Sequence, residues 1–196
     1  MKHWNLVFTL AAALACATTA QAQVPPTAAE TAAYQGLHAA AARGDMPTLN
    51  KLIAAKGDLN ARDAYGRTPL HVATYARQAE AIRALAKAGA GLDLLENDRY
   101  DAVTIAAVAD DEATLRVLLQ LGASAKQVTS RYDGTALIES IVLGNGGPRH
   151  QATLQALLRA GASQTLTDRQ GNTPLQLARQ RGFSEMVRML EEAGAR

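Results

Sequence analysis

Cysteine is almost absent from this chain, and its position limits the chemistry that the protein can perform. Cys16 is the only cysteine among the 196 residues. It lies in an apolar run near the N-terminus that ends at Ala20-Gln21-Ala22, a small-x-small pattern typical of signal peptidase sites. We therefore expect residues 1–22 to be a signal peptide that is cleaved after Ala22. A mature chain without cysteine has no disulfides, no thiol catalysis and no thiolate metal ligation.

The same segment predicts export without a membrane span. Its apolar run is shorter than the ~20 residues that a membrane-spanning helix needs, and an uncleaved N-terminal anchor is the alternative. A further alternative is lipoprotein processing at Cys16, because the preceding Ala13-Leu14-Ala15 resembles a bacterial lipobox with its branched residue one place late. The short signal looks bacterial, so we expect the protein in the periplasm.

Aromatic residues are also scarce, and neither sign of charge predominates. Aromatics make up 4% of the chain although 48% is hydrophobic, so alanine and leucine provide most of the apolar content. This composition favours closely packed helices over a β-sandwich. Lys and Arg number 20 against 18 acidic residues. That near-balance argues against a protein that binds nucleic acid or an anionic membrane surface.

Catalytic and metal-binding motifs are missing from the sequence as well. It contains no GxSxG, HExxH or P-loop motif, and the glycine-rich stretch from Gly144 to Gly147 is not followed by Lys-Ser or Lys-Thr. The acidic pair Asp110-Asp111 is expected at a helix N-terminus rather than in a cleft with a second carboxylate. We therefore predict a protein that is not an enzyme and that has no cofactor and no metal.

One phrase of the sequence occurs twice: GRTPLHVAT at 66–74 returns as GNTPLQLAR at 171–179. Related segments begin at Leu37, Asp101 and Thr135, at a spacing of about 33 residues that lengthens towards the C-terminal end. A second landmark is an apolar stretch closed by Gly-Ala, which ends at Ala90, Ala123, Ala162 and Ala195. Because the two landmarks drift together, the chain contains a true internal repeat.

These segments resemble ankyrin repeats. The best copies, Asp63–Ala90 and Asp168–Ala195, each have a turn, a TPLH-type box, a second helix and a Gly-Ala terminator in order. The resemblance covers residues 31–196 and implies an all-α repeat solenoid of helix-turn-helix pairs with short β-hairpin connections. A short disordered lead-in is expected at 23–30. The five repeats are predicted at 31–60, 61–93, 94–126, 127–165 and 166–196.

Ordinary physical preferences account for the residues within a repeat. In the second repeat Thr68 can cap the first helix, and Pro69 fits the first turn, where no amide donor is needed. The resemblance implies that His38 and His71, in the TPLH-type box, hydrogen-bond backbone near the hairpins and are structural. The buried face is predicted to contain Leu70, Ala73, Ile82 and Leu85.

The fourth repeat carries an insertion, Gly144–Thr153, between its two helices. Its Gly-Gly-Pro-Arg-His core predicts a mobile, polar loop, and we interpret His150 as a solvated loop residue. Insertions in solenoids often lie at a binding edge. The segment is therefore either a second contact site or a tolerated loop without a function.

The few aromatic residues are the main candidates for a binding surface. In the repeat register, Tyr65 and Tyr132 share one hairpin-tip position, Tyr100 occupies the other variable tip site, and Tyr75 ends an inner helix. The resemblance implies that these positions line the concave face, where partners bind, and tyrosine is enriched in interfaces. The alternative is that the tip tyrosines only shield neighbouring hairpins from water. The register places nearby the polar residues Arg62, Arg67, Arg77, Asp98, Arg99, Arg131, Arg169 and Asn172.

The sequence therefore predicts a non-catalytic protein–protein interaction module in the bacterial periplasm, monomeric on its own, which binds a partner protein through its concave face and hairpin tips. One alternative is an inhibitor or immunity protein that neutralises a toxin or hydrolase. Another is a protective binder of an envelope enzyme, and a third is a passive structural spacer. All of these use the same kind of surface, so the partner stays open at this point.

Overall fold

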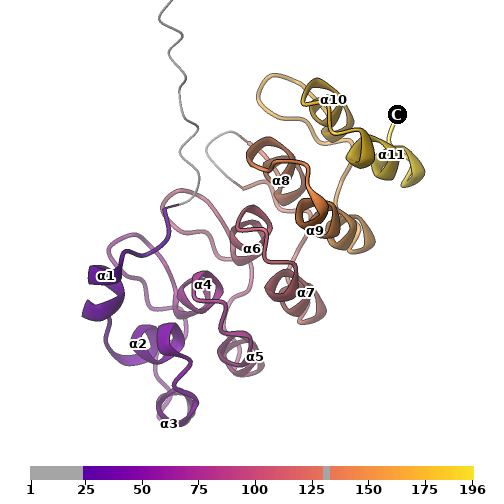
Figure 1. Cartoon of the computed structure of the whole chain (residues 1–196). Coiled ribbons are helices and arrows are strands. Elements are labelled where there is room, and N and C mark those ends of the chain that lie inside the picture. The colour runs from indigo at the N-terminus through magenta and orange to yellow at the C-terminus, as the bar shows by residue number, and fades with distance from the viewer. Residues whose placement is uncertain (1–23, 130–132) are drawn as a thin grey trace, which may run out of the picture.

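A computed structural model describes residues 24–129 and 133–196. After a short first helix, α1 (Ala28–Ala33), the described residues form five helix pairs stacked side by side (Figure 1). The pairs are α2 (Gly36–Arg43) with α3 (Met46–Ala54), α4 (Pro69–Tyr75) with α5 (Ala79–Lys87), α6 (Ala102–Val108) with α7 (Glu112–Gln120), α8 (Ala136–Leu143) with α9 (Pro148–Arg159), and α10 (Pro174–Gln180) with α11 (Ser184–Glu192). Each predicted repeat range contains one pair. The predicted all-α repeat solenoid is confirmed.

The stack has two rows of helices. Figure 1 shows α2, α4, α6, α8 and α10 in one row, which we call the inner row, and their partners in the outer row. The residues predicted for the buried face, Leu70, Ala73, Ile82 and Leu85, are all buried. Alanines fill much of the space between inner helices, where a side chain with no rotamers to lose allows close approach. The core is therefore continuous across repeats, and each pair depends on its neighbours for burial.

The inner helices begin where the sequence supplies a cap. The Thr68 side chain accepts the His71 amide and Pro69 occupies the first turn, as predicted. Thr173 forms the equivalent capping box with Gln176. Asp101 replaces threonine in the third repeat and accepts the Thr104 amide at 2.7 Å. The same starting point for each helix keeps the repeats in register.

The connections between repeats are tight turns that project from one edge of the stack. In the first of them the Asp63 amide donates to the Arg67 carbonyl at 3.0 Å, and Glu96 and Tyr100 repeat the pattern at 3.0 Å. Among the described residues the β structure consists of one isolated bridge, between Val128 and Thr135. We refer to these turns as hairpins, and to their edge of the stack as the hairpin edge.

The two histidines of the TPLH-type box join helices to hairpins, so their predicted structural role is confirmed. His38 Nε2 donates to the Arg67 carbonyl at 2.9 Å, and His71 Nε2 donates to the Leu94 carbonyl at 2.8 Å. His71 Nδ1 accepts the Thr68 amide at 3.0 Å. Burial lowers the pKa of His71 to about 4, which keeps the ring neutral and fixes this pattern of donor and acceptor.

The insertion in the fourth repeat does not form the mobile loop that the sequence predicted. Helix α9 begins at Pro148 and takes up most of the added residues. His150 is 9% exposed, and its Nδ1 lies 3.6 Å from the carboxylate of Asp110 in the preceding repeat. Arg149 donates to the Asp110 carbonyl at 2.7 Å. The insertion lengthens an outer helix and fastens it to the neighbouring turn, and His150 is not a solvated residue.

The lead-in also differs from the prediction. Helix α1 starts at Ala28, and its Thr27–Glu30 capping box satisfies the first turn. The segment before it is bound as well, since the Val24 carbonyl accepts a hydrogen bond from Arg67 at 2.9 Å. Residues 24–34, which we call the N-terminal segment, are therefore structured where disorder was expected for 23–30.

Candidate protein-binding surface

Tyr65 is the predicted contact residue whose position agrees best with the prediction. It lies at the tip of the first hairpin, and 47% of it is exposed. The guanidinium of Arg67 lies 4.3 Å from its ring centre, and this cation–π contact holds the ring in place. A hydrogen bond from the Tyr65 hydroxyl holds the pKa of Glu30 at about 2, well below its usual value. Tyr65 is thus an exposed but fixed aromatic group, which suits an interface anchor.

Two other predicted contact residues are buried, and for them the prediction of accessible tip positions is wrong. Tyr100 is 4% exposed and Arg67 is 1% exposed. Both residues immediately precede a helix cap, where the chain turns from the hairpin into the inner row. At that point the side chain enters the layer between adjacent hairpins instead of extending from their tips.

Arg67 is the centre of a polar cluster at the start of α4. Its two terminal nitrogens face the Val24 carbonyl at 2.9 Å, the Tyr34 hydroxyl at 3.4 Å, and the carboxylates of Asp63 at 3.7 Å and Glu30 at 3.8 Å. Its Nε atom is buried and has no hydrogen-bond partner among the described residues. The planar guanidinium therefore connects the first hairpin to the N-terminal segment.

Tyr75 completes this cluster from the far end of α4. The Arg67 guanidinium lies 5.8 Å from its ring centre. The Tyr75 hydroxyl is buried without a hydrogen-bond partner among the described residues. Burial, and then the nearby carboxylate of Glu96, raise the pKa of this hydroxyl far above its usual value. Tyr75 therefore stays neutral, and its side chain is half-buried.

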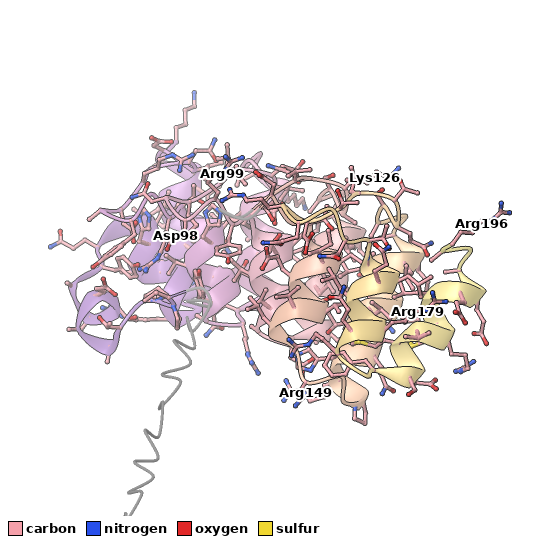
Figure 2. The ribbon with its side chains drawn as sticks, turned by 90° about the horizontal axis from the view of Figure 1, so that it is seen from above. Asp98, Arg99, Lys126, Arg149, Arg179 and Arg196 are labelled. Carbon is pink, nitrogen blue, oxygen red and sulfur yellow. The ribbon has the colours of Figure 1, made fainter. Side chains whose placement is uncertain are left out.

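Glu96 is a buried acid that the sequence analysis did not single out. It lies in the second hairpin and is 6% exposed. Burial, and then repulsion by Asp98, raise its pKa to about 7. Predicted contact residue Asp98 is only partly buried and lies beside Arg99 at the hairpin edge (Figure 2).

Four predicted polar residues have structural partners. Arg62 donates to the carbonyls of Gly66 and Leu95 at 2.7 Å and so joins two hairpins. Arg77 lies at the opposite edge, 3.6 Å from the carboxylate of Asp111. Arg169 lies 3.5 Å from Asp133.

The last of these four is Asn172, whose amide donates to the Asp168 carboxylate at 3.1 Å within the fourth hairpin. Two further predictions, Arg131 and Tyr132, lie outside the described residues. The structure therefore leaves their proposed contact role as a prediction.

Arg99 stands out among the exposed residues of the hairpin edge. Its φ of 65° is left-handed, and the equivalent tip positions hold Gly66, Asp133 and Gly171, all with positive φ. A residue with a Cβ is strained in this region, whereas glycine is not. Lys56, Arg77 and Asp110 are also left-handed, but they lie in turns away from the hairpin tips, and Arg77 and Asp110 have ion-pair partners in the next repeat. Arg99 is exposed and forms no ion pair with a described residue, so no ion pair in the described ranges accounts for its strained backbone.

Comparison with known proteins agrees with this architecture. The family of ankyrin repeats in three copies matches residues 37–130, and a single ankyrin repeat matches residues 170–196. An ankyrin repeat protein of Escherichia coli (strain K12), YahD, is 32% identical over 190 residues, which cover 80% of this chain and 94% of that protein. The chain belongs to the ankyrin-repeat family. Such repeats generally serve as protein–protein interaction modules and are generally non-catalytic.

In more distant relatives of this ankyrin-repeat protein, the matching region is only part of a longer chain. The NF-kappa-B p105 subunit of Gallus gallus is 28% identical over 70% of this chain and 17% of its own length. Human ankyrin repeat and SOCS box protein 16 is 28% identical over 82% of this chain and 36% of its own length. These proteins share the repeat with this chain.

Metal sites and membrane-spanning helices are two further features to consider in the part of this ankyrin-repeat protein that the structure describes. In residues 24–129 and 133–196, His, Cys, Asp and Glu side chains form no group of three that could hold a metal ion. Within the same ranges, every helix is too short or too polar to cross a bilayer. The candidate site is the hairpin edge with the adjoining concave surface, where Tyr65 and Arg99 are exposed and Asp98 is partly exposed.

Proposed function

We propose that this ankyrin-repeat protein is a non-catalytic binding module of the bacterial periplasm that engages a protein partner through its concave face and hairpin edge. Arg99 carries this proposal. It is exposed, has left-handed backbone that glycine would adopt without strain, and forms no ion pair with a described residue. Tyr65 supports it from the preceding hairpin as a fixed aromatic group.

The periplasmic location rests on the N-terminal sequence. Cleavage after Ala22 would leave the binding module free in that compartment. YahD comes from a bacterium, and the match covers 94% of its length, which agrees with a bacterial origin. An inhibitor of a toxin or hydrolase, or a protector of an envelope enzyme, would use this same surface.

Capture of a partner tests the proposal directly. The tagged chain without residues 1–22 is incubated with periplasmic extract, beside the double variant Tyr65→Ala with Tyr132→Ala. We expect a stoichiometric partner that the double variant binds at least about tenfold more weakly, because truncated aromatic anchors lose contact area. The variant Arg159→Ala on the outer row is the control and should bind normally.

The captured protein also separates the alternatives. A secreted toxin or hydrolase would identify an inhibitor, and an envelope enzyme would identify a protective binder. A partner that binds the wild type and the double variant equally, with unchanged circular dichroism, would contradict the tyrosine anchors. No captured partner at all would contradict a protein-binding function in this compartment.

The substitution Arg99→Gly separates binding from folding. Glycine adopts the left-handed tip conformation freely, so we expect the free energy of unfolding to rise by about 0.5–1 kcal/mol. Loss of the guanidinium should at the same time weaken partner binding several-fold. Urea unfolding and titration with the captured partner measure the two effects, and unchanged affinity in the stabilised variant would show that Arg99 makes no contact.

A further inference from the structure

The N-terminal segment lies on the concave side of the first two repeats, where it behaves as a ligand of its own chain. In Figure 1 it passes beside the inner helices α2 and α4 before it enters α1. Pro25, Pro26 and Thr31 close a pocket of about 90 Å³ whose other side is lined by α2 and α4, including Tyr75. The segment therefore covers part of the surface that ankyrin repeats offer to partners.

The contacts of the segment define the chemistry that this surface accepts. Pro25-Pro26 fixes an extended backbone, which leaves its carbonyls free to accept hydrogen bonds. The Val24 carbonyl accepts from Arg67 at 2.9 Å, and the Glu30 carboxylate lies 3.8 Å from the same guanidinium. At its other end, Tyr34 donates to Asp63 at 2.8 Å. The surface takes an extended stretch followed by a short helix, which together bring a carbonyl and a carboxylate to one buried arginine.

The segment does not satisfy every group that it covers. Arg67 is 1% exposed, and its Nε atom has no hydrogen-bond partner among the described residues. The hydroxyl of Tyr75, in the same cluster, is also buried and unpaired. An unpaired buried polar group costs free energy. A ligand that supplied acceptors to Arg67 Nε and to the Tyr75 hydroxyl, and otherwise made the same contacts, would therefore bind more tightly than residues 24–34 do. Such a ligand could therefore displace the N-terminal segment.

We propose that the concave surface of the first two repeats binds an acidic, proline-containing segment of a partner protein, extended at its start and helical after it, and that residues 24–34 occupy this surface until the partner displaces them. This inference rests on the proposed binding function and names the chemistry of the ligand. A tethered segment competes at an effective concentration in the millimolar range. Only a partner with better-matched contacts, or with a second contact such as the hairpin edge, then gains access.

The test is binding of a labelled peptide that copies residues 24–34, added to the full chain without residues 1–22. In the variant Glu30→Ala the tethered segment loses its carboxylate and its capping box, so it competes less well. We expect this variant to bind the peptide at least about tenfold more tightly than the wild type does. Glu80→Ala on α5 removes an exposed carboxylate from the outer row and should bind like the wild type.

Two further measurements check the geometry. The Thr31 and Tyr34 amides donate to backbone within the N-terminal segment, so their hydrogen exchange should quicken when excess peptide displaces it. A peptide with lysine at the position of Glu30 should bind at least about tenfold more weakly, because its ammonium would face Arg67. Arg67→Lys keeps the charge and removes the planar fork, and it is introduced into the Glu30→Ala chain, in which the tethered segment competes less. This double variant should bind the peptide more weakly than Glu30→Ala alone.

Several results would overturn the inference. If the peptide bound neither the wild type nor Glu30→Ala, the surface would not take a segment of this kind. If it bound both equally, residues 24–34 would not compete for the surface. A dimer in light scattering with concentration-dependent exchange would assign the surface to a second copy. Partner capture that depends on Tyr65 and Tyr132, with no effect of Glu30→Ala on capture or on peptide binding, would contradict this inference alone. Peptide binding without any captured partner would contradict the proposed function instead.

Discussion

Arg67→Ala is expected to lower the free energy of unfolding by about 3–5 kcal/mol, because the substitution removes the cation from a buried cluster. The carboxylates of Asp63 and Glu30 would lose their common partner, and the Val24 carbonyl would lose its donor. The Tyr65 ring would also lose its cation–π contact with the guanidinium. Urea unfolding of the chain without residues 1–22, followed by circular dichroism at pH 7, measures the change.

Two further variants test whether the loss of stability is specific to the buried guanidinium of Arg67 or follows the removal of an arginine from this hairpin in general. Arg62 lies in the same hairpin and donates to two carbonyls, but it is exposed, so Arg62→Ala should cost about 1 kcal/mol or less. Arg67→Lys keeps a charge without the planar fork and should fall between the two. If Arg67→Ala cost no more than Arg62→Ala, the cluster would not stabilise the first two repeats.

The repeat architecture could be predicted from the sequence because its signals are local. Thr68 and Pro69 specify a helix start from neighbouring residues alone, and the alternation of buried positions follows from helical periodicity. His71 could be assigned a structural role because it lies in the TPLH-type box, whose histidine the ankyrin resemblance places against hairpin backbone. Such features need no knowledge of which distant segments meet.

Two errors in the sequence analysis concern signals that were present. The Thr27–Glu30 spacing fits a capping box, which predicts a helix start in the lead-in. Pro148 follows two glycines and precedes a helical pattern, which favours a helix start inside the insertion. The prolines of the lead-in were interpreted as disorder although a capping box follows them. In the insertion the glycines and the proline were interpreted as loop, although proline at the first turn is a helix signal.

Burial of Arg67 and Tyr100 could not be predicted in the same way. The hairpin-tip position of Tyr65 and the position before the helix cap lie only two residues apart, yet the side chains go to opposite environments. The partners of Arg67 include Val24 and Tyr34, which reach it only through the path of the N-terminal segment. That path is a long-range feature with no repeat to indicate it. The raised pKa of Glu96 could not be predicted either, because its first cause is burial, which depends on how distant parts of the chain pack together.

Glu96→Gln is expected to stabilise the protein at alkaline pH and to have little effect in acid. Burial, and then Asp98, raise the pKa of Glu96 to about 7, whereas the unfolded chain ionises this group near its usual value of 4.5. Between these two values the folded state holds the proton that the unfolded state has released, so stability falls as pH rises. Glutamine removes this penalty. At pH 8 the variant should be more stable than the wild type by about 2–3 kcal/mol.

Only the difference between variant and wild type shows this effect clearly. His71, with a pKa lowered to about 4, makes stability rise with pH in part of the same window, and Asp101, with a pKa raised to about 6, acts like Glu96. Both are present in the two proteins and cancel when free energies of unfolding are subtracted at each pH. The difference should be small below pH 4.5, grow up to pH 7 and then stay constant. Asp98→Asn removes the second cause of the shift and so lowers the pKa of Glu96 in the folded protein. In this background the stability difference produced by Glu96→Gln should level off at a lower pH and at a smaller value. A difference that is flat from pH 4 to 8 would mean that Glu96 is solvated in the folded protein.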